Sequence, residues 1–175
     1  MHRYAPELPL PSYSYVTGRF PHPTRDRAGH SFGHVEPFPP PLDPARWGES
    51  RTYLHALDLF NHGYYWEAHE AWEALWHAAG RRGVVADFLK GLIKLAAAGV
   101  KVREGRADGV RRHARRAIEL FGQVQADPYT AGGPNCCGLP LDALIQCAMQ
   151  IASEPPVARD HTAPVEVVLP FALTP

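Results

Sequence analysis

The stretch WEAHEAWEALW, Trp66–Trp76, decides how the fold of this chain is read. It places one histidine, three glutamates and three tryptophans among residues that are otherwise only alanine and leucine. The stretch predicts a helix from about residue 64 to 79, closed by Gly80, since glycine is common just after a helix end. A helix with this content raises the question of what its polar side chains do.

Helical geometry sorts these side chains onto faces. At about 100° per residue, His69 and Glu73 lie about 40° apart on one face. Three aromatic residues fall within about 60° of His69 on the same stripe: Tyr65, Trp66 and Trp76. Glu67 and Glu70 lie on or near the far side. We therefore expect one histidine and one carboxylate at the edge of the buried face, walled by aromatic rings.

The periodicity elsewhere predicts four further helices. Apolar residues recur at helical spacing over about 50–61, 84–104, 108–125 and 141–152. Gly63 and Gly105 follow the first two of these ranges, as glycine often does at a helix end. Short loops between the predicted helices favour antiparallel neighbours. The predicted fold class is all-α, a compact antiparallel bundle of about five helices. The run VEVVL, residues 165–169, offers one short strand, which alone makes no sheet.

The two ends of the chain differ from this middle part. Residues 1–47 are rich in proline, aromatics and histidine, and proline is excluded from helix interiors and central strands. We expect an irregular Pro-rich N-terminal arm pinned across the helices, with a disordered tail as the alternative. The expected division is an arm over 1–47, a helical domain over 48–153 and a Pro-rich C-terminal tail over 154–175.

Composition narrows the function classes. The 175 residues carry 18 basic and 18 acidic side chains, so there is no overall charge that favours nucleic acid or an anionic membrane. Three cysteines make a poor disulfide framework and no apolar run approaches the roughly 20 residues of a membrane span. We expect a cytoplasmic protein that binds an unidentified small molecule, with self-association into a homo-oligomer as a further option. Ten histidines suggest metal or proton chemistry.

A histidine and a carboxylate four residues apart can both bind one metal ion. The first hypothesis is therefore a metal-dependent hydrolase in which His69 and Glu73 hold a divalent ion, zinc or another. Since a metal needs three or four donors, arm histidines complete the site, and His22 and His30 are the candidates. The ion would lower the pKa of a water molecule. Glu70 points about 100° away from His69 and is a poor general base.

Three lysines on the third predicted helix complicate this hypothesis. Lys90, Lys94 and Lys101 recur at spacings of four and seven and share one stripe. Such a stripe is commonly a solvated face. If the helix is central, these lysines could instead neutralise Glu73 or hold an anionic substrate, with Lys101 as a catalytic residue. A metal and an ammonium compete for the same carboxylate.

Two alternatives need no metal. In one, Glu73 is the general base and His69 orients it. In the other, the protein is a non-catalytic structural or interaction module, in which His69, Glu73 and Trp76 form a satisfied, buried hydrogen-bond network that fixes the packing of the helices.

The segments FNHGYYWEAHEAWEALWH, GLIKLAAAGVKVREG and GVRRHARRAIELF carry a resemblance to a known family. Over about residues 50–122 the chain resembles the prokaryotic domain-of-unknown-function family numbered 309, whose hallmark His-x3-Glu-x2-Trp falls on His69, Glu73 and Trp76. The resemblance implies a helical fold and the family's label of predicted metal-dependent hydrolase. Glutamine is usual in the family at the position of Lys90 and histidine at that of Lys101, so a metal here depends on substitute ligands.

Overall fold

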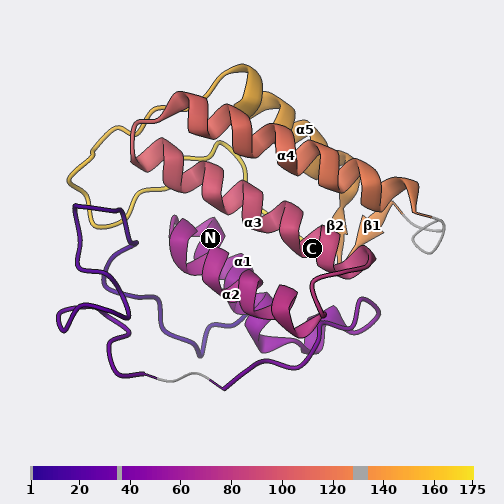
Figure 1. Ribbon diagram of the computed structural model, residues 1–175, viewed down its shortest axis with the longest axis horizontal. Coiled ribbons are helices and arrows are strands. Elements are labelled where there is room, and N and C mark those ends of the chain that lie inside the picture. The colour runs from indigo at the N-terminus through magenta and orange to yellow at the C-terminus, as the bar shows by residue number, and fades with distance from the viewer. Residues whose placement is uncertain (1, 35–36, 128–133) are drawn as a thin grey trace.

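The computed structural model describes residues 2–34, 37–127 and 134–175, and five α-helices dominate it (Figure 1). A short 3-10 helix, Trp47–Glu49, precedes them. The helices are α1 (Arg51–Asn61), α2 (Tyr65–Ala78), α3 (Val84–Arg103), α4 (Ala107–Ala126) and α5 (Leu141–Ser153). The predicted all-α bundle is confirmed, and each predicted helix boundary lies within about two residues of the observed one.

Each helix packs against the next one in sequence, and α3 is the middle member of this series, with α2 on one side and α4 on the other. Glycines on α3 allow these close approaches. A Cβ atom at Gly99 would lie only 2.5 Å from the Tyr65 ring of α2, and Gly91 faces the Phe121 ring of α4 just as closely. The core around them is apolar and well filled, with Trp72, Phe60 and their neighbours almost completely buried. Tight packing of α2 on α3 fixes which face of α2 is free to form a site.

A two-stranded antiparallel hairpin was not predicted. Strands β1 (Asn135–Cys136) and β2 (Leu139–Pro140) pair immediately before α5. The turn between them uses left-handed backbone at Cys137 and Gly138, with φ of 48° and 82°. The run at residues 165–169, considered as a strand, forms none.

The N-terminal arm is fastened to the outside of α1 and α2 (Figure 1). The backbone N–H groups of Tyr4 and Ala5 donate to the buried Asp58 carboxylate of α1, at 2.8 and 2.9 Å. Tyr13, Ser14 and Val16 of the arm are also buried. Because the arm is irregular, side chains of the helices satisfy its backbone groups.

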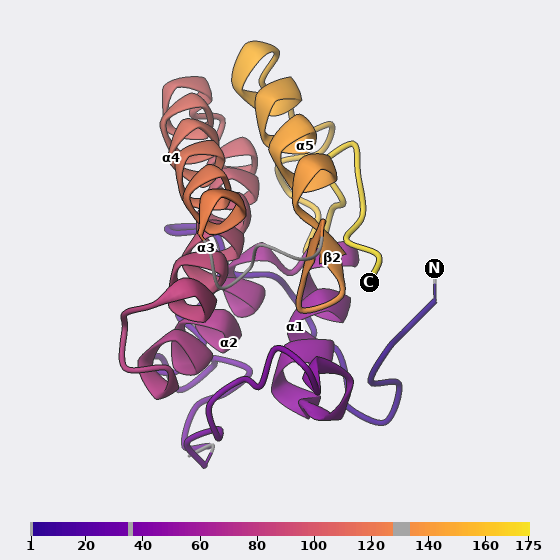
Figure 2. The same cartoon turned by 90° about the vertical axis from the view of Figure 1, so that its right-hand side faces the viewer.

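The C-terminal tail runs back past α5 toward α1 (Figure 2). It is held by polar side chains of the bundle: the Tyr65 hydroxyl accepts from the N–H groups of Val168 and Leu169, and the Asn61 amide bonds both backbone groups of Leu173. Arm and tail therefore depend on residues of α1 and α2. No helix in the described part of the chain is long and apolar enough to cross a membrane.

Candidate functional site

Three side chains of α2 come together in a way that suits a metal ion. One ligand atom each of His69, Glu70 and Glu73 lies within 4.8 Å of the others. No other group of three histidine, cysteine or acidic residues in the described ranges meets this criterion. His69 and Glu73 share a face, as predicted. Glu70 was expected to point away, but its carboxylate reaches to within ion-pair distance of His69.

The histidine of this cluster has an unused nitrogen. The Nδ1 atom of His69 is shielded from solvent and makes no hydrogen bond within the described structure. A Glu70 carboxylate oxygen lies 3.4 Å from it, which is ion-pair distance, but the two groups do not meet hydrogen-bond geometry. An imidazole nitrogen with carboxylate oxygens around it is a donor set that suits zinc and similar divalent ions.

The hydrogen-bond network of the structural alternative does not form among the described residues. The indole N–H of Trp76 is buried without an acceptor, and His69 Nδ1 is likewise unpaired. The Trp76 ring instead faces cations: Arg81 lies 5.8 Å and Lys90 5.4 Å from its centre. Trp76 therefore packs against positive charge and does not bridge His69 to Glu73.

Positive charge from α3 and α4 lies beside the cluster. Burial lowers the pKa of Lys94, with Lys90 and Arg116 acting in the same direction and Glu73 opposing them. Burial also lowers the pKa of His113 on α4 to about 4, and Lys94 adds to the effect. His113 is therefore neutral at pH 7. The cluster thus has one partly buried ammonium near Glu73 and one uncharged imidazole near His69.

Two residues expected at the site have other partners. The ammonium of Lys101 lies 2.6 Å from the Glu104 carboxylate, an ion pair within α3 and its C-terminal cap. The Tyr65 ring lies in the core and its hydroxyl holds the tail. The structure therefore gives these residues structural partners, although Lys101 still contributes to the positive potential that lowers the pKa of His113.

The arm histidines do not join His69 and Glu73. His22 lies against Trp66, with ring centres 5.6 Å apart, and its Nδ1 accepts the N–H of Thr24. His30 points to Glu67, its Nε2 lying 3.2 Å from a carboxylate oxygen. The expectation that these histidines complete a metal site with His69 is not what the geometry shows, since the arm covers a different face of α2.

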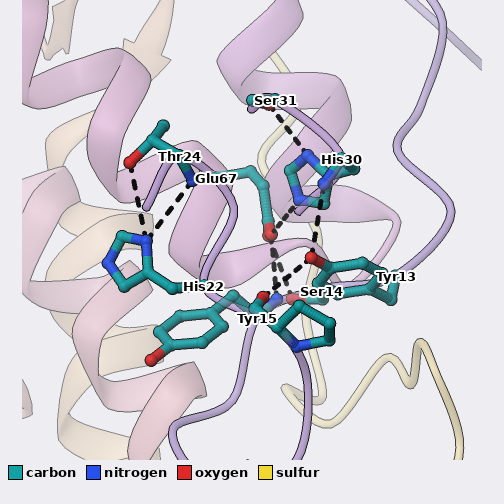
Figure 3. A network of polar contacts seen from close by, with 9 residues as sticks. Tyr13, Ser14, Tyr15, His22, Thr24, His30, Ser31 and Glu67 are labelled. Atoms are coloured by element: carbon teal, nitrogen blue, oxygen red, sulfur yellow. Dashed lines mark hydrogen bonds and ion pairs between the residues drawn. The ribbon is translucent and has the colours of Figure 1, made fainter. Parts of the chain in front are cut away.

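That other face is organised around Glu67, which was expected on the far side of the helix but is buried (Figure 3). Its carboxylate accepts from the Tyr15 N–H at 2.8 Å and from the Ser14 hydroxyl at 3.1 Å, in addition to its contact with His30. Three hydrogen-bonding partners from the arm fix this carboxylate in position. Glu67 is thus the point at which α2 holds the arm.

A pocket of about 350 Å³ lies between the arm and helices α1 and α2. Its walls include the imidazoles of His30 and His34, the carboxylates of Glu67 and Glu70, and apolar side chains such as Phe38. No lysine or arginine is among the lining residues that the structure describes. Glu70 lines this pocket and also belongs to the cluster of His69, Glu70 and Glu73, so the pocket borders the cluster.

Sequence reasoning missed three contributors: Glu67, Glu70 and His113. Helical spacing in α2 distinguishes an apolar face from the opposite face. It does not show that an irregular arm buries part of that opposite face. His113 lies in the arginine-rich run RRHARR, which reads as a solvated face. Its only sequence signal is that it follows the buried Val110 by three residues, at helical spacing.

The fold and the cluster together define a small all-helical bundle with a His/Glu site on its second helix. Residues 53–113 match the family model described as Domain of unknown function (DUF309), which confirms the resemblance over α1 to the first part of α4. The matched range contains the whole cluster, whereas the arm and the tail lie outside it. No curated protein matches the chain.

Proposed function

We propose that this protein is a metal-dependent hydrolase in which His69, Glu70 and Glu73 bind a divalent metal ion. The observation that carries the proposal is the approach of three ligand atoms to within 4.8 Å, one of them from an imidazole whose buried Nδ1 has no hydrogen bond in the described structure. A buried polar atom without a partner costs about 1–3 kcal/mol, so a bound cation would relieve a real penalty.

A ligand set of three residues from α2 fits such an ion better than the set with arm histidines that the sequence suggested. Glu70 replaces the arm histidines as the third donor, and His113 is a neutral imidazole in the neighbourhood. Two carboxylates neutralise the charge of a divalent ion, and His69 remains uncharged as a ligand. When bound, the ion supplies Lewis acidity that activates water for hydrolysis.

The other side chains position the substrate and balance charge. Lys94 and Lys90 place ammonium groups on the α3 side of the cluster, where they favour negative charge that develops on a substrate. Trp76 adds a partly buried apolar surface on the same helix, whereas Trp66 packs against Tyr15 and His22 of the arm. Glu73 makes no hydrogen bond or ion pair within the described residues, so its carboxylate remains available for a metal or a proton.

Elemental analysis of protein purified without a histidine tag or chelator tests the metal site. We expect about one equivalent of divalent metal in the wild type, and its loss in His69→Ala and Glu73→Gln with helicity retained. His77→Ala is the matched control, because this imidazole lies on the same helix but accepts from Arg81 instead. This variant should keep its metal.

The opposite result supports the structural module. If neither the wild type nor His77→Ala binds metal after dialysis against zinc or manganese, and His69→Ala melts at a lower temperature, the cluster serves packing. Hydrolysis of a panel of phosphate and carboxylate esters by metal-loaded protein then tests the reaction. Activity that is identical in wild type and Glu73→Gln would contradict the proposed site.

A further inference from the structure

His30 connects Ser31 to Glu67 in a chain of polar contacts, called the relay below, that the proposed metal site does not use. Its Nδ1 lies 2.9 Å from the Ser31 hydroxyl, and its Nε2 lies 3.2 Å from the Glu67 carboxylate (Figure 3). A carboxylate can only accept, so Nε2 carries the proton and the lone pair of Nδ1 faces Ser31. This is the arrangement of nucleophile, base and orienting acid found in hydrolases with an activated serine.

The relay is held from several sides. Glu67 is fixed by Tyr15 and Ser14, as described, and the side chains of His30 and Glu67 are 9% and 6% exposed. The His30 ring packs edge-on against Tyr13, with centres 4.7 Å apart. Gly29 lies so close to the backbone of the preceding turn that no side chain fits there, which fixes how the next two residues are presented.

All three members of the relay line the 350 Å³ pocket. This volume is within the range of small-molecule sites. Its apolar walls and the lack of any described lysine or arginine in the lining favour an uncharged, apolar substrate over an anion. His34 also lines it, and an imidazole N–H can donate a hydrogen bond to a carbonyl oxygen.

We propose that Ser31, His30 and Glu67 form a second, metal-independent hydrolytic site for small, neutral carboxylic esters. As the Ser31 oxygen bonds to the ester carbonyl carbon, its proton passes to Nδ1 of His30. The imidazolium is stabilised by Glu67. The bond between the carbonyl carbon and the alcohol oxygen then breaks, and the alcohol leaves with the proton from Nδ1. Water repeats the sequence on the acyl-serine and releases the carboxylic acid.

Covalent labelling of the full chain in the presence of a chelator tests this site separately from the metal site. An alkyl fluorophosphonate should phosphonylate Ser31 with loss of fluoride, which intact-protein and peptide mass spectrometry detect as one adduct. His30→Ala should slow labelling by about 100-fold or more, the usual contribution of a general base. Ser12→Ala is the matched control, because it removes an exposed serine of the same arm but neither the nucleophile, the base nor a donor to Glu67; Ser31 should still be labelled in this variant.

Three outcomes would overturn the proposal: no adduct on Ser31 of the folded protein, equal labelling of the exposed Ser12, or unchanged labelling in His30→Ala with wild-type circular dichroism. If His30→Ala releases the arm, Ser31→Ala decides, because it leaves the contact between His30 and Glu67 intact. In chelator, this variant should lose the hydrolysis of p-nitrophenyl butyrate, and retained hydrolysis would refute the site. Since chelator is present throughout, absence of metal from the protein leaves this test unaffected.

Discussion

At the scale of single residues, α2 shows how much depends on side-chain direction. His69, Glu70 and Glu73 gather on one side of the helix, whereas Glu67, only two positions before His69, serves the arm on another. Four polar residues within seven positions thus have two separate tasks. Residue type and spacing alone do not separate these tasks, because the distinction depends on which segment covers which face.

Glu67→Gln should destabilise the attachment of the arm. The change removes the charge that three donors share, and hydrogen bonds to a charged group contribute roughly 1.5–3 kcal/mol each. We expect the free energy of unfolding to fall by about 1–3 kcal/mol, measured by urea titration, and residues 1–47 to become more sensitive to limited proteolysis.

Glu119→Gln is the control for this change. Glu119 also accepts from a cation, Arg116 on α4, at 2.6 Å, but its side chain is 58% exposed. Exposed ion pairs contribute about 0–1 kcal/mol, so the unfolding free energy should hardly change. A larger loss in Glu119→Gln than in Glu67→Gln would contradict the role given to Glu67.

Tyr65 makes stability sensitive to alkaline pH. Burial raises its pKa to about 12, although the N–H groups of Leu169 and Val168 that donate to the hydroxyl oppose the shift. Because the folded-state pKa lies above the unfolded value of 10.0, this contribution is complete below pH 10 and is lost as pH rises toward 12. The loss amounts to about 2–3 kcal/mol.

Tyr65→Phe tests this dependence. At pH 7 the variant should be less stable by about 1–3 kcal/mol, because two buried N–H groups lose their acceptor. Its stability should then fall less than that of the wild type between pH 9 and 11. Burial also raises the pKa of Tyr53. Because both proteins contain Tyr53, its contribution to the pH dependence cancels in the comparison. Parallel pH profiles would rule out a contribution from Tyr65.

At the scale of elements, the helices were predictable and their surroundings were not. Apolar spacing locates the helices, and the glycines at positions 63, 80 and 105 mark the ends of α1 to α3, because these signals are local. The hairpin β1–β2 has two-residue strands, too short for an alternating pattern. The course of the arm depends on Asp58 and Glu67, which lie more than fifty residues away in sequence.

Two helix-interior glycines offer a matched pair of predictions. In Gly99→Ala, the new methyl group would meet the Tyr65 ring at 2.5 Å, so α2 and α3 must separate. We expect a loss of about 1–3 kcal/mol in unfolding free energy. In Gly122→Ala, nothing lies within 4 Å of the new group, and higher helix propensity should add up to about 1 kcal/mol. Thermal melts of both variants decide; equal shifts would contradict the close packing of α2 on α3.

At the scale of the whole molecule, metal and fold should be linked. A ligand that binds only the folded state adds about 2.7 kcal/mol of stability at one hundred times its Kd. The proposed site therefore predicts that zinc or manganese raises the melting temperature of the wild type and that chelator reverses this rise. Glu73→Gln should show neither effect. A rise of equal size in both proteins would place the metal elsewhere.

The part of the candidate site that could be predicted is the pair on one helix, His69 and Glu73. The approach of Glu70 and the neighbouring His113 could not be predicted, because the first depends on the conformation of a long side chain and the second on the packing of α4 against α3. The role of the lysine stripe could not be predicted for a similar reason. Lys101 pairs with Glu104 near the helix end, whereas Lys94 is partly buried.

The Asn61 side chain behaves toward Leu173 as a neighbouring strand would, giving one acceptor and one donor to the same residue at 2.7 and 2.8 Å. A backbone amide in an irregular segment, outside any helix or strand, ordinarily exchanges its hydrogen with solvent quickly. Here that amide should exchange orders of magnitude more slowly, and Asn61→Ala should restore fast exchange at this position while leaving the deuterium uptake of α3 unchanged.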